Sequence, residues 1–229
     1  MRWQDFFGFA APPLCAGCGR ALVAGERSIC ARCELDFERH SVAEDFTGPL
    51  RARILPRTAP VDAVFCWSAY THDNAFGAVL RRAKYADRPT LMADLGAIMG
   101  ARIAGHPLAA ATDVLLPVPM HWLKRLRRGY NQTEILAHAL GKALGVPVGD
   151  NLVARRRHVS QTRLSADERR RALGSSFALR HPGELTGLRV GIVDDIITTG
   201  GTLSAAVETL MQARPASVTV FVLAATPRE

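Results

Sequence analysis

The sequence predicts an α/β fold, with a three-layer domain built around a mostly parallel sheet and a small cysteine-rich module in front of it. Three observations support this prediction. From residue 61 onward, short apolar runs alternate with amphipathic stretches, as expected where strands alternate with helices. One apolar run ends on two adjacent aspartates and a Thr/Gly turn, at residues 190–202. Four cysteines form two Cys-x2-Cys pairs within the first 33 residues.

The first 55 residues differ in composition from the rest, and we expect residues 1–55 to form a metal-binding module with its linker. Residues 35–60 are polar and basic and contain several prolines, so the linker is expected near residues 50–60. The main domain then spans residues 56–229. A chain of 229 residues, of which 48% are hydrophobic, can bury one substantial core and one small accessory unit.

Cys15, Cys18, Cys30 and Cys33 predict a structural zinc site. Each Cys-x2-Cys pair can close on one side of a tetrahedral Zn²⁺ ion, and four thiolates leave no open position for catalysis. The eleven residues between the pairs are fewer than the roughly 15 to 20 that are typical of such sites, so disulfides are the alternative. A reducing compartment disfavours disulfides. The fifth cysteine, Cys66, lies in an apolar run and is expected to be a buried thiol.

We expect a cytoplasmic protein with no segment inserted in a membrane. No apolar run approaches the roughly 18 residues that are needed to span a bilayer. The apolar stretch at residues 6–11 is short and is followed by two prolines, which is not the pattern of a secretion signal.

Hydrophobic periodicity predicts the elements of the main domain in chain order. Strands are expected at residues 61–70, 113–118, 176–179, 190–193 and 217–225, and helices at 74–85, 91–105, 133–144, 167–172 and 203–213. We expect the strand at 176–179 to lie at an edge and the strand at 217–225 to close the sheet. Residues 152–164 are polar, basic and without helical periodicity, which indicates a mobile loop that could close over a ligand.

Residues 190–202 predict a site for a ribose 5-phosphate. Parallel sheets bind ligands beyond the carboxyl ends of their strands, where the two aspartates are expected. The small residues and hydroxyls of the turn, with the N-terminus of the next helix, suit a phosphate. Carboxylates repel a phosphate, so the aspartates need sugar hydroxyls or a divalent cation as partners. The predicted site residues are Asp194, Asp195, Thr198, Thr199, Gly200, Gly201 and Thr202. The alternative is a solvated Asp-Asp turn that ends an ordinary buried strand.

The positive charge of the chain is concentrated between residues 121 and 171. This segment holds twelve Lys or Arg residues and four Asp or Glu residues, an excess of eight that equals the net charge of +8 for the whole chain. Such a segment suits a polyphosphate or the backbone of a nucleic acid, although a solvated basic surface is the alternative. The residues expected to contact a pyrophosphate or a DNA backbone are Lys124, Arg125, Arg127, Arg128, Arg155, Arg156, Arg157 and Arg163.

The loop after the strand at 113–118 adds amide and aromatic side chains to this basic segment. Asn131 and Gln132 could bind a second phosphate group together with the basic residues. Trp122 and Tyr130 could stack on the bases of a single-stranded nucleic acid, or they could pack in the core.

Residues 190–202 resemble the phosphoribosyl pyrophosphate loop of the type I phosphoribosyltransferases. In that family the acidic pair holds the ribose 2′- and 3′-hydroxyls and the turn holds the 5′-phosphate, roles that would fall to Asp194 and Asp195 and to residues 198–202. The resemblance implies a type I phosphoribosyltransferase-like fold, with phosphoribosyl pyrophosphate and Mg²⁺ as the ligand. Gly191 departs from the pattern, because the family usually has a large apolar residue there.

Taken as a whole, the chain resembles the ComF family, in which a double zinc finger precedes a phosphoribosyltransferase-like domain. The resemblance is carried by the four cysteines and by residues 80–85, 117–119, 128–132, 161–164 and 190–202, with Arg169. Ala172 departs from it, because relatives often have Asn there.

The ComF resemblance implies a function in DNA uptake. The family is linked to the uptake of single-stranded DNA during natural transformation. This implies single-stranded DNA as a partner and, through the zinc-ribbon-like module, helicase or processing proteins of the competence machinery. The alternative is a Mg²⁺-dependent phosphoribosyltransferase of nucleotide salvage or cofactor metabolism. No stretch of the sequence identifies an acceptor for such a transfer, so the sequence supports ligand binding better than catalysis.

Overall fold

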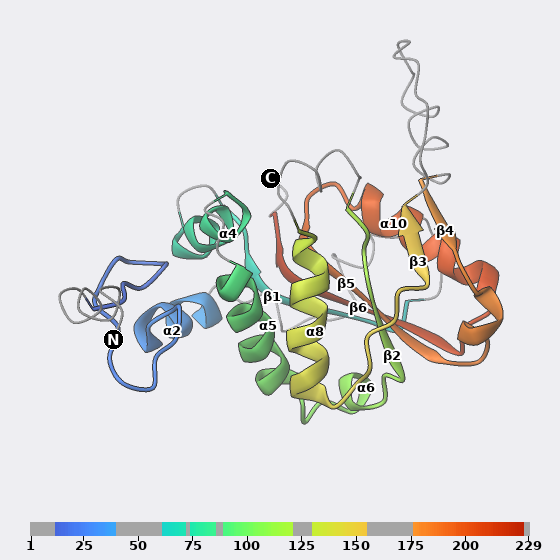
Figure 1. The fold of residues 1–229 in the computed structure, drawn as a ribbon, viewed down its shortest axis with the longest axis horizontal. Helices are drawn as coiled ribbons and strands as arrows, with labels where there is room; N and C mark the ends of the chain where they lie inside the picture. The colour runs from blue at the N-terminus through green and yellow to red at the C-terminus, as the bar shows by residue number, and fades with distance from the viewer. Residues whose placement is uncertain are drawn as a thin grey trace, which may run out of the picture.

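The computed structural model describes residues 12–39, 61–71, 74–85, 89–120, 130–154 and 176–226 (Figure 1). The helices are α2 (Ala31–Arg39), α4 (Ala75–Tyr85), α5 (Pro89–Ile103), α6 (Pro107–Ala110), α8 (Gln132–Leu144) and α10 (Gly201–Leu210), with short 3-10 helices η1 (Pro182–Leu185) and η2 (Met211–Ala213). The strands are β1 (Ala63–Ala69), β2 (Val114–Pro117), β3 (Leu152–Ala154), β4 (Phe177–Leu179), β5 (Arg189–Ile197) and β6 (Ser217–Ala225). Within these ranges, no helix has the length and apolar character needed to cross a membrane.

Four strands form a parallel sheet in the order β1-β6-β5-β2. This order confirms the expected mostly parallel sheet. The last strand, β6, does not close the sheet as we expected, because it lies between β1 and β5. Residues 218–225 of β6 are all buried, as is typical of a strand that is covered on both faces. An apolar run indicates such burial but does not say which strands lie on either side.

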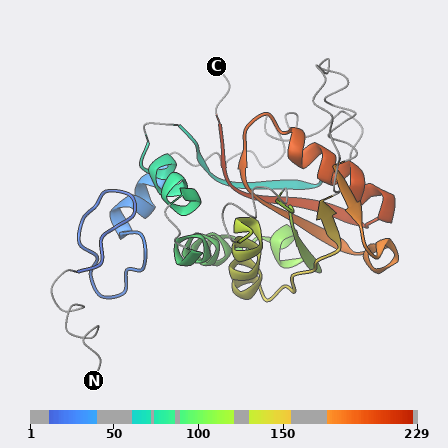
Figure 2. The same ribbon diagram turned by 45° about the horizontal axis from the view of Figure 1, so that its top comes forward.

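Helices cover both faces of the sheet, which gives three layers (Figure 2). Helices α4, α5 and α8 lie on one face and α10 lies on the other. On the first face, Leu95 of α5 and Leu136 of α8 share a core with Phe221 of β6. On the second face, Val207 of α10 shares a core with Ile192 of β5. Cys66 is buried in this second core, as the sequence predicted.

Gly191 allows β5 to pack closely against its neighbours. A Cβ atom at this position would lie 2.5 Å from Cδ2 of Leu115 and 2.7 Å from Cε2 of Phe221. Both neighbours are fully buried, and the Phe221 ring stacks on Phe65 with ring centroids 5.2 Å apart. A larger residue at 191 would displace this stack. The packing therefore explains the glycine that departs from the expected pattern.

A second, two-stranded antiparallel sheet pairs β3 with β4. Two expectations were wrong here. Residues 152–154 form a strand, although the sequence predicted a loop from residue 152, and β4 pairs with β3 rather than with an edge of the main sheet. Leu152 and Phe177 are buried in the core beside α10, so apolar contacts hold this short pair in place. Residues 155–164 and the helix expected at 167–172 lie outside the described residues.

Residues 12–39 form the cysteine-rich module, which packs directly on α4 and α5 (Figure 1). The ring of Phe37 in α2 meets Phe76 of α4 edge-on, with centroids 4.7 Å apart, and it meets Trp67 of β1 at 5.9 Å. Glu34 of α2 forms an ion pair with Arg102 of α5 at 2.9 Å. The module and the domain therefore share one hydrophobic core. The linker and the boundary expected at residue 55 lie outside the described residues, so that boundary stays a prediction.

Candidate functional site

The candidate ligand site forms where β2 and β5 part. Strand β2 pairs with β5 only as far as Val193, whereas β5 continues to Ile197 because it stays paired with β6. Asp194 and Asp195 therefore lie within the strand, not beyond its end as the sequence predicted. They begin the part of β5 that has no β2 partner, at the carboxyl edge of the sheet where parallel α/β folds bind ligands.

The two aspartate side chains make different contacts. Asp194 is buried, with 9% of its surface exposed, and its Oδ1 accepts a hydrogen bond from the backbone N–H of Asp195 at 2.8 Å. The Oδ2 of Asp195 forms an ion pair with Nζ of Lys84 from α4, also at 2.8 Å. Neighbouring residues of a strand face opposite sides. The structure thus directs Asp195 toward α4 and leaves Asp194 to face the loop.

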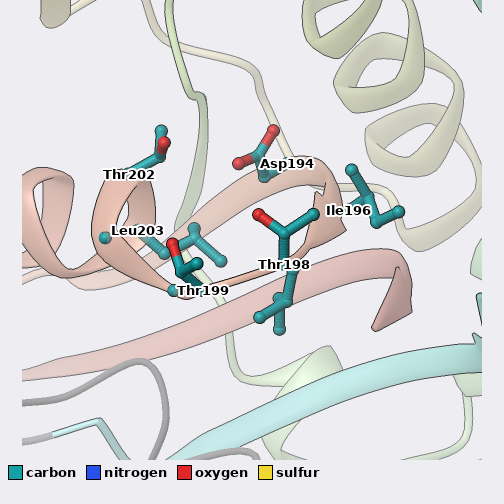
Figure 3. A pocket seen from close by; sticks show the side chains of 9 residues that line it. Asp194, Ile196, Thr198, Thr199, Thr202 and Leu203 are labelled. Carbon is teal, nitrogen blue, oxygen red and sulfur yellow. The ribbon is translucent and has the colours of Figure 1, made fainter. Parts of the chain in front are cut away.

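The loop after β5 borders a small hollow, open to solvent, that we call the loop hollow (Figure 3). It is lined by Asp194, Ile196, Ile197, Thr198, Thr199, Gly200, Gly201, Thr202 and Leu203, so six of the seven predicted site residues come together there and Asp195 does not. Figure 3 shows the carboxylate of Asp194 and the side chain of Thr202 on the same side of the loop. An acceptor for hydroxyl groups thus lies beside a run of threonine and glycine.

The geometry of the turn follows from Gly200. This residue has φ of 83°, in the left-handed region that favours glycine, and it is the N-cap of α10 without a side-chain capping hydrogen bond. The first N–H groups of α10 are consequently directed at the loop hollow, where the positive end of the helix dipole favours an anion. Thr226, directly after β6, supports the start of the turn, because its N–H donates a hydrogen bond to the carbonyl of Ile197 at 2.8 Å.

Lys84 lies beside the candidate site, although the sequence indicated no ligand role for it and placed it only within residues 80–85 of the ComF resemblance. The side chain reaches the carboxyl edge of the sheet from α4, and the Lys84 and Asp195 side chains are only 18% and 14% exposed. The sequence showed a lysine within an amphipathic helix, which is equally typical of a solvated position. Only the tertiary fold brings the end of α4, with its ammonium, to Asp195.

The four cysteines that we predicted as metal ligands form one cluster. The Sγ atoms of Cys15, Cys18, Cys30 and Cys33 all lie within 4.8 Å of one another, and those of Cys18 and Cys30 are 3.7 Å apart. Tetrahedral Zn²⁺ with Zn–S bonds of 2.3 Å places its sulfur ligands about 3.8 Å apart, so the cluster fits this ion. All five cysteines are free thiols, which argues against the disulfide alternative. The cluster could hold a metal ion and is consistent with a zinc module.

The surroundings of the cluster prepare it for a cation. Burial opposes ionisation of Cys30, but hydrogen bonds from the Cys33 backbone and the Arg20 guanidinium lower the pKa of its thiol to about 6. Burial, together with the neighbouring thiols, raises the pKa of Cys33. Four thiolates cannot share this small volume without a cation to balance them. The Sγ of Cys15 also accepts backbone N–H groups from Gly17 and Cys30 at 3.3 Å each, as in metal-binding turns.

Comparison with known proteins places this fold and these sites in a family. A model of the phosphoribosyl transferase domain matches residues 126–229. Competence protein F of Haemophilus influenzae is 40% identical over 94 residues, which cover 40% of this chain and 41% of that protein. DNA utilization protein YhgH of Salmonella typhi is 30% identical over 220 residues, which cover 93% of this chain and 90% of that protein. The chain belongs to the ComF family.

Solved structures give weaker matches to this ComF-family chain. The glutamine phosphoribosylpyrophosphate amidotransferase of B. subtilis is 21% identical, with a TM-score of 0.44 over 62% of this chain and 30% of that chain. A purine phosphoribosyltransferase from Pyrococcus horikoshii is 19% identical, with a TM-score of 0.34 over 59% of this chain and 75% of that chain. The type I phosphoribosyltransferase fold follows instead from the domain model and from the parallel three-layer sheet.

Two amides that we expected to bind phosphate are used inside this ComF-family fold. Gln132 is fully buried, and its Nε2 donates to the carbonyl of Ala83 at 3.2 Å. Asn131 is 3% exposed and donates from Nδ2 to Glu134 at 3.2 Å. The hydroxyl of Tyr130 lies 3.5 Å from the same Ala83 carbonyl. Tyr130 and Gln132 join the start of α8 to the end of α4, whereas Asn131 contacts Glu134 within the first turn of α8. Both amides are buried within the fold, contrary to the phosphate role that we expected for them.

The basic residues predicted from the sequence lie outside the described residues. They are Lys124, Arg125, Arg127, Arg128, Arg155, Arg156, Arg157 and Arg163, and Trp122 lies outside as well. Their assignment to a pyrophosphate or a DNA backbone stays a prediction. The described parts on either side, β2, α8 and β3, border the segments that carry them.

Proposed function

We propose that this chain binds phosphoribosyl pyrophosphate, or a related sugar phosphate, at the loop hollow, and that it acts on single-stranded DNA during uptake for natural transformation. One observation supports the ligand more than any other. The uncapped N-terminus of α10 and the buried carboxylate of Asp194 face the same small hollow. A phosphate suits the first group and sugar hydroxyls suit the second, so a sugar phosphate matches both.

The proposal includes two metal ions, Mg²⁺ with the sugar phosphate and Zn²⁺ in the cysteine-rich module. Mg²⁺ binds oxygen ligands and retains several waters, so the phosphate oxygens of the ligand and the Asp194 carboxylate are suitable partners. Zn²⁺ would be held by the four cysteines, where it supplies cross-linking of the module and no catalytic position.

The proposal of DNA uptake rests on the family and on charge. Relatives are named competence protein F and DNA utilization protein YhgH. Residues 121–171 of this chain carry an excess of eight positive charges, which is the property that binds a nucleic acid backbone. We expect the strand of DNA to contact this segment, with the module available to proteins of the uptake machinery.

Thermal unfolding with phosphoribosyl pyrophosphate and Mg²⁺ tests the ligand. A ligand at 100 times its Kd raises the free energy of unfolding by about 2.7 kcal/mol. We expect stabilisation of the wild type and its loss in Asp194→Asn, with a weaker loss in Asp195→Asn. The matched control is Asp150→Asn, because Asp150 pairs with Arg180 on the exposed surface, away from the hollow. An unchanged response in Asp194→Asn would exclude the hollow as the site.

Binding of a labelled single-stranded oligonucleotide at several salt concentrations tests the second half of the proposal. Affinity should fall as salt rises, because binding releases the counterions of the phosphates. It should persist in Asp194→Asn, since the DNA is expected on the basic segment. Absence of binding at low salt would remove the DNA from the proposal and leave the sugar phosphate.

A Mg²⁺-dependent phosphoribosyltransferase of nucleotide salvage or cofactor metabolism is the alternative function. The phosphoribosyl transferase domain model favours it, because the matched region includes the loop hollow. Release of pyrophosphate with a panel of nucleobases, amines and ammonia would support the transfer. If the protein binds the ligand but releases no pyrophosphate with any member of the panel, the transferase function would be rejected and ligand binding would remain.

A further inference from the structure

Helix α4 touches both the candidate site and the cysteine-rich module. Nζ of Lys84 lies 2.8 Å from Oδ2 of Asp195, and Nη1 of Arg82 donates a hydrogen bond to the carbonyl of Ala16, which lies between Cys15 and Cys18. Residues two apart on a helix do not face the same way. The last turns of α4 therefore stand between the metal cluster and the ligand site and contact each with a different cationic side chain.

On the site side, Lys84 fixes one carboxylate. The ion pair uses Oδ2 of Asp195, and no hydrogen bond from the part of the chain that the structure describes reaches Oδ1. The ammonium holds the carboxylate in one orientation and leaves one oxygen to accept from a sugar hydroxyl. It also offsets one of the two negative charges beside a polyanionic ligand. Because the pair is mostly buried, solvent and salt screen this effect weakly.

On the module side, α4 rests on the metal-binding turn itself. A Cβ atom at Gly17 would lie 2.7 Å from Sγ of Cys33 and 3.6 Å from Cγ2 of Val79 in α4. The backbone of the turn is thus in close contact with both a metal ligand and the helix. The edge-on contact of Phe37 with Phe76, at 4.7 Å, adds a second fixed contact between the module and α4. A change in the turn on metal loss would displace the surface on which α4 rests.

We propose that Lys84 is a positioning residue of the sugar-phosphate site and that the metal-loaded module holds it in place through α4. The proposal rests on the proposed function, because it concerns the affinity of the loop hollow for its ligand. It predicts that metal binding and ligand binding are coupled. Coupling of two binding equilibria is reciprocal, so each ligand raises the affinity of the other by the same factor.

Four variants separate the two contacts that the last turns of α4 make, with titration calorimetry of phosphoribosyl pyrophosphate and Mg²⁺ as the measurement. Lys84→Met should weaken binding about 10-fold, because an ion pair loses one partner beside an anionic ligand, and Lys84→Arg should recover most of the loss. Arg82→Met should weaken binding about 5-fold, although Arg82 contacts the module and not the site. The matched control is Glu34→Gln, which releases the module from Arg102 of α5 and not from α4. It should bind as the wild type does.

A second measurement uses wild-type protein and needs no variant to fold. The Zn²⁺ affinity is determined by equilibrium competition with a zinc-selective chelator, with and without saturating phosphoribosyl pyrophosphate and Mg²⁺. We expect the ligand to raise Zn²⁺ affinity about 5-fold in the wild type. The ratio of the Zn²⁺ affinities with and without the ligand should approach one in Arg82→Met and stay near the wild-type value in Glu34→Gln.

The outcomes distinguish this inference from the proposed function. If the wild type does not bind the sugar phosphate, the proposed function fails and this inference fails with it. If the wild type binds, Asp194→Asn does not, and the ligand leaves Zn²⁺ affinity unchanged, only the inference is overturned. Wild-type affinity in folded Lys84→Met, or tighter binding, would also overturn the role of Lys84. Equal weakening by Arg82→Met and Glu34→Gln would show a general loosening of the module rather than coupling through α4.

Discussion

In the cysteine-rich module, three of the four cysteines that could hold a metal ion are buried, whereas in the loop after β5 the three threonines are exposed and Asp194 is the buried polar group. Cys15, Cys30 and Cys33 belong to the same hydrophobic core as Phe37 and Phe76, whereas Cys18 is exposed. The threonines and glycines of the loop belong to the rim of a hollow. One region places its functional atoms inside the fold, and the other places them at the surface of it.

The difference shows how each region divides its residues between stability and binding. Removing a cysteine disturbs a core and, with zinc bound, a tetrahedral cross-link, so stability should fall most. Removing a polar group from the loop takes away a ligand contact while the core beneath it stays packed, so affinity should fall most. Mutations that change one quantity and not the other can test this division.

Cys30→Ser should have the largest effect on stability. Cys30 is fully buried, and its loss leaves three thiolates around a cation that needs four ligands. We expect the free energy of unfolding in urea to fall by about 3 kcal/mol or more, with loss of bound zinc. Cys66→Ser is the matched control, because Cys66 is buried outside the cluster. An equal loss in both variants would mean that burial of a thiol, not metal binding, accounts for the effect.

Gly191→Ala should have the second-largest effect on stability, because it overpacks the core around β5. Gly191 lies in the strand that leads to the loop and does not line the loop hollow. The added Cβ would lie 2.5 Å from Leu115 and 2.7 Å from Phe221, two fully buried side chains. Overpacking of this kind costs about 1 to 3 kcal/mol, to be measured by urea unfolding. Gly183→Ala, where the added Cβ would meet no heavy atom within 4 Å, is the control and should change stability little. A neutral Gly191→Ala would indicate that the core repacks freely around β5.

Gly200→Ala compares the two regions directly when it is paired with Gly25→Ala in the module. Both glycines have positive φ, 83° and 90°, so each substitution should cost about 1 kcal/mol in unfolding experiments. Only Gly200 borders the loop hollow. We therefore expect Gly200→Ala alone to weaken binding of phosphoribosyl pyrophosphate, measured by calorimetry. Equal affinities in the two variants would argue that the backbone of the turn does not hold the phosphate.

Local pattern was sufficient to predict much of this molecule. The four strands of the main sheet and helices α4, α5, α8 and α10 follow from apolar periodicity, whereas β3 and α6 were not predicted. The cysteine cluster follows from two Cys-x2-Cys pairs, because these features depend on residues close in sequence. The loop at 198–202 was predictable for the same reason. Its glycines and threonines form one continuous turn, and the structure gathers all five around the hollow.

What could not be predicted depends on contacts between distant segments. The position of β6 inside the sheet is decided by pairing with β1 and β5, and the length of β5 beyond Val193 is decided by β6. The ion pair of Lys84 with Asp195 joins residues 111 positions apart, so no local pattern marks it. The same holds for Gln132, whose amide is committed to the end of α4 and not to a ligand.

Asp113→Asn should have the smallest effect and tests a polar contact that belongs to neither region. The carboxylate of Asp113 accepts hydrogen bonds from the Arg189 side chain at 2.6 and 3.0 Å and from its backbone N–H at 2.8 Å, where β2 and β5 begin. The Arg189 side chain, then its backbone, lower the pKa of Asp113 from 3.8 to about 2. The pair is exposed, so its loss should cost under about 1 kcal/mol at pH 7.

The difference in the free energy of unfolding between wild type and Asp113→Asn should depend on pH in a direction that follows from the lowered pKa of Asp113. A carboxyl group with a lowered pKa in the folded state stabilises the fold above its unfolded value, here 3.8, and the stabilisation is lost as pH falls through about 2. Urea unfolding of wild type and Asp113→Asn should therefore differ between pH 5 and 7 and converge near pH 2. Affinity for phosphoribosyl pyrophosphate should be unchanged at pH 7, because Asp113 lies at the opposite end of β5 from the loop hollow. A loss of affinity would mean that the start of β5 also positions the loop, and the two regions would then not be separable in the way their burial implies.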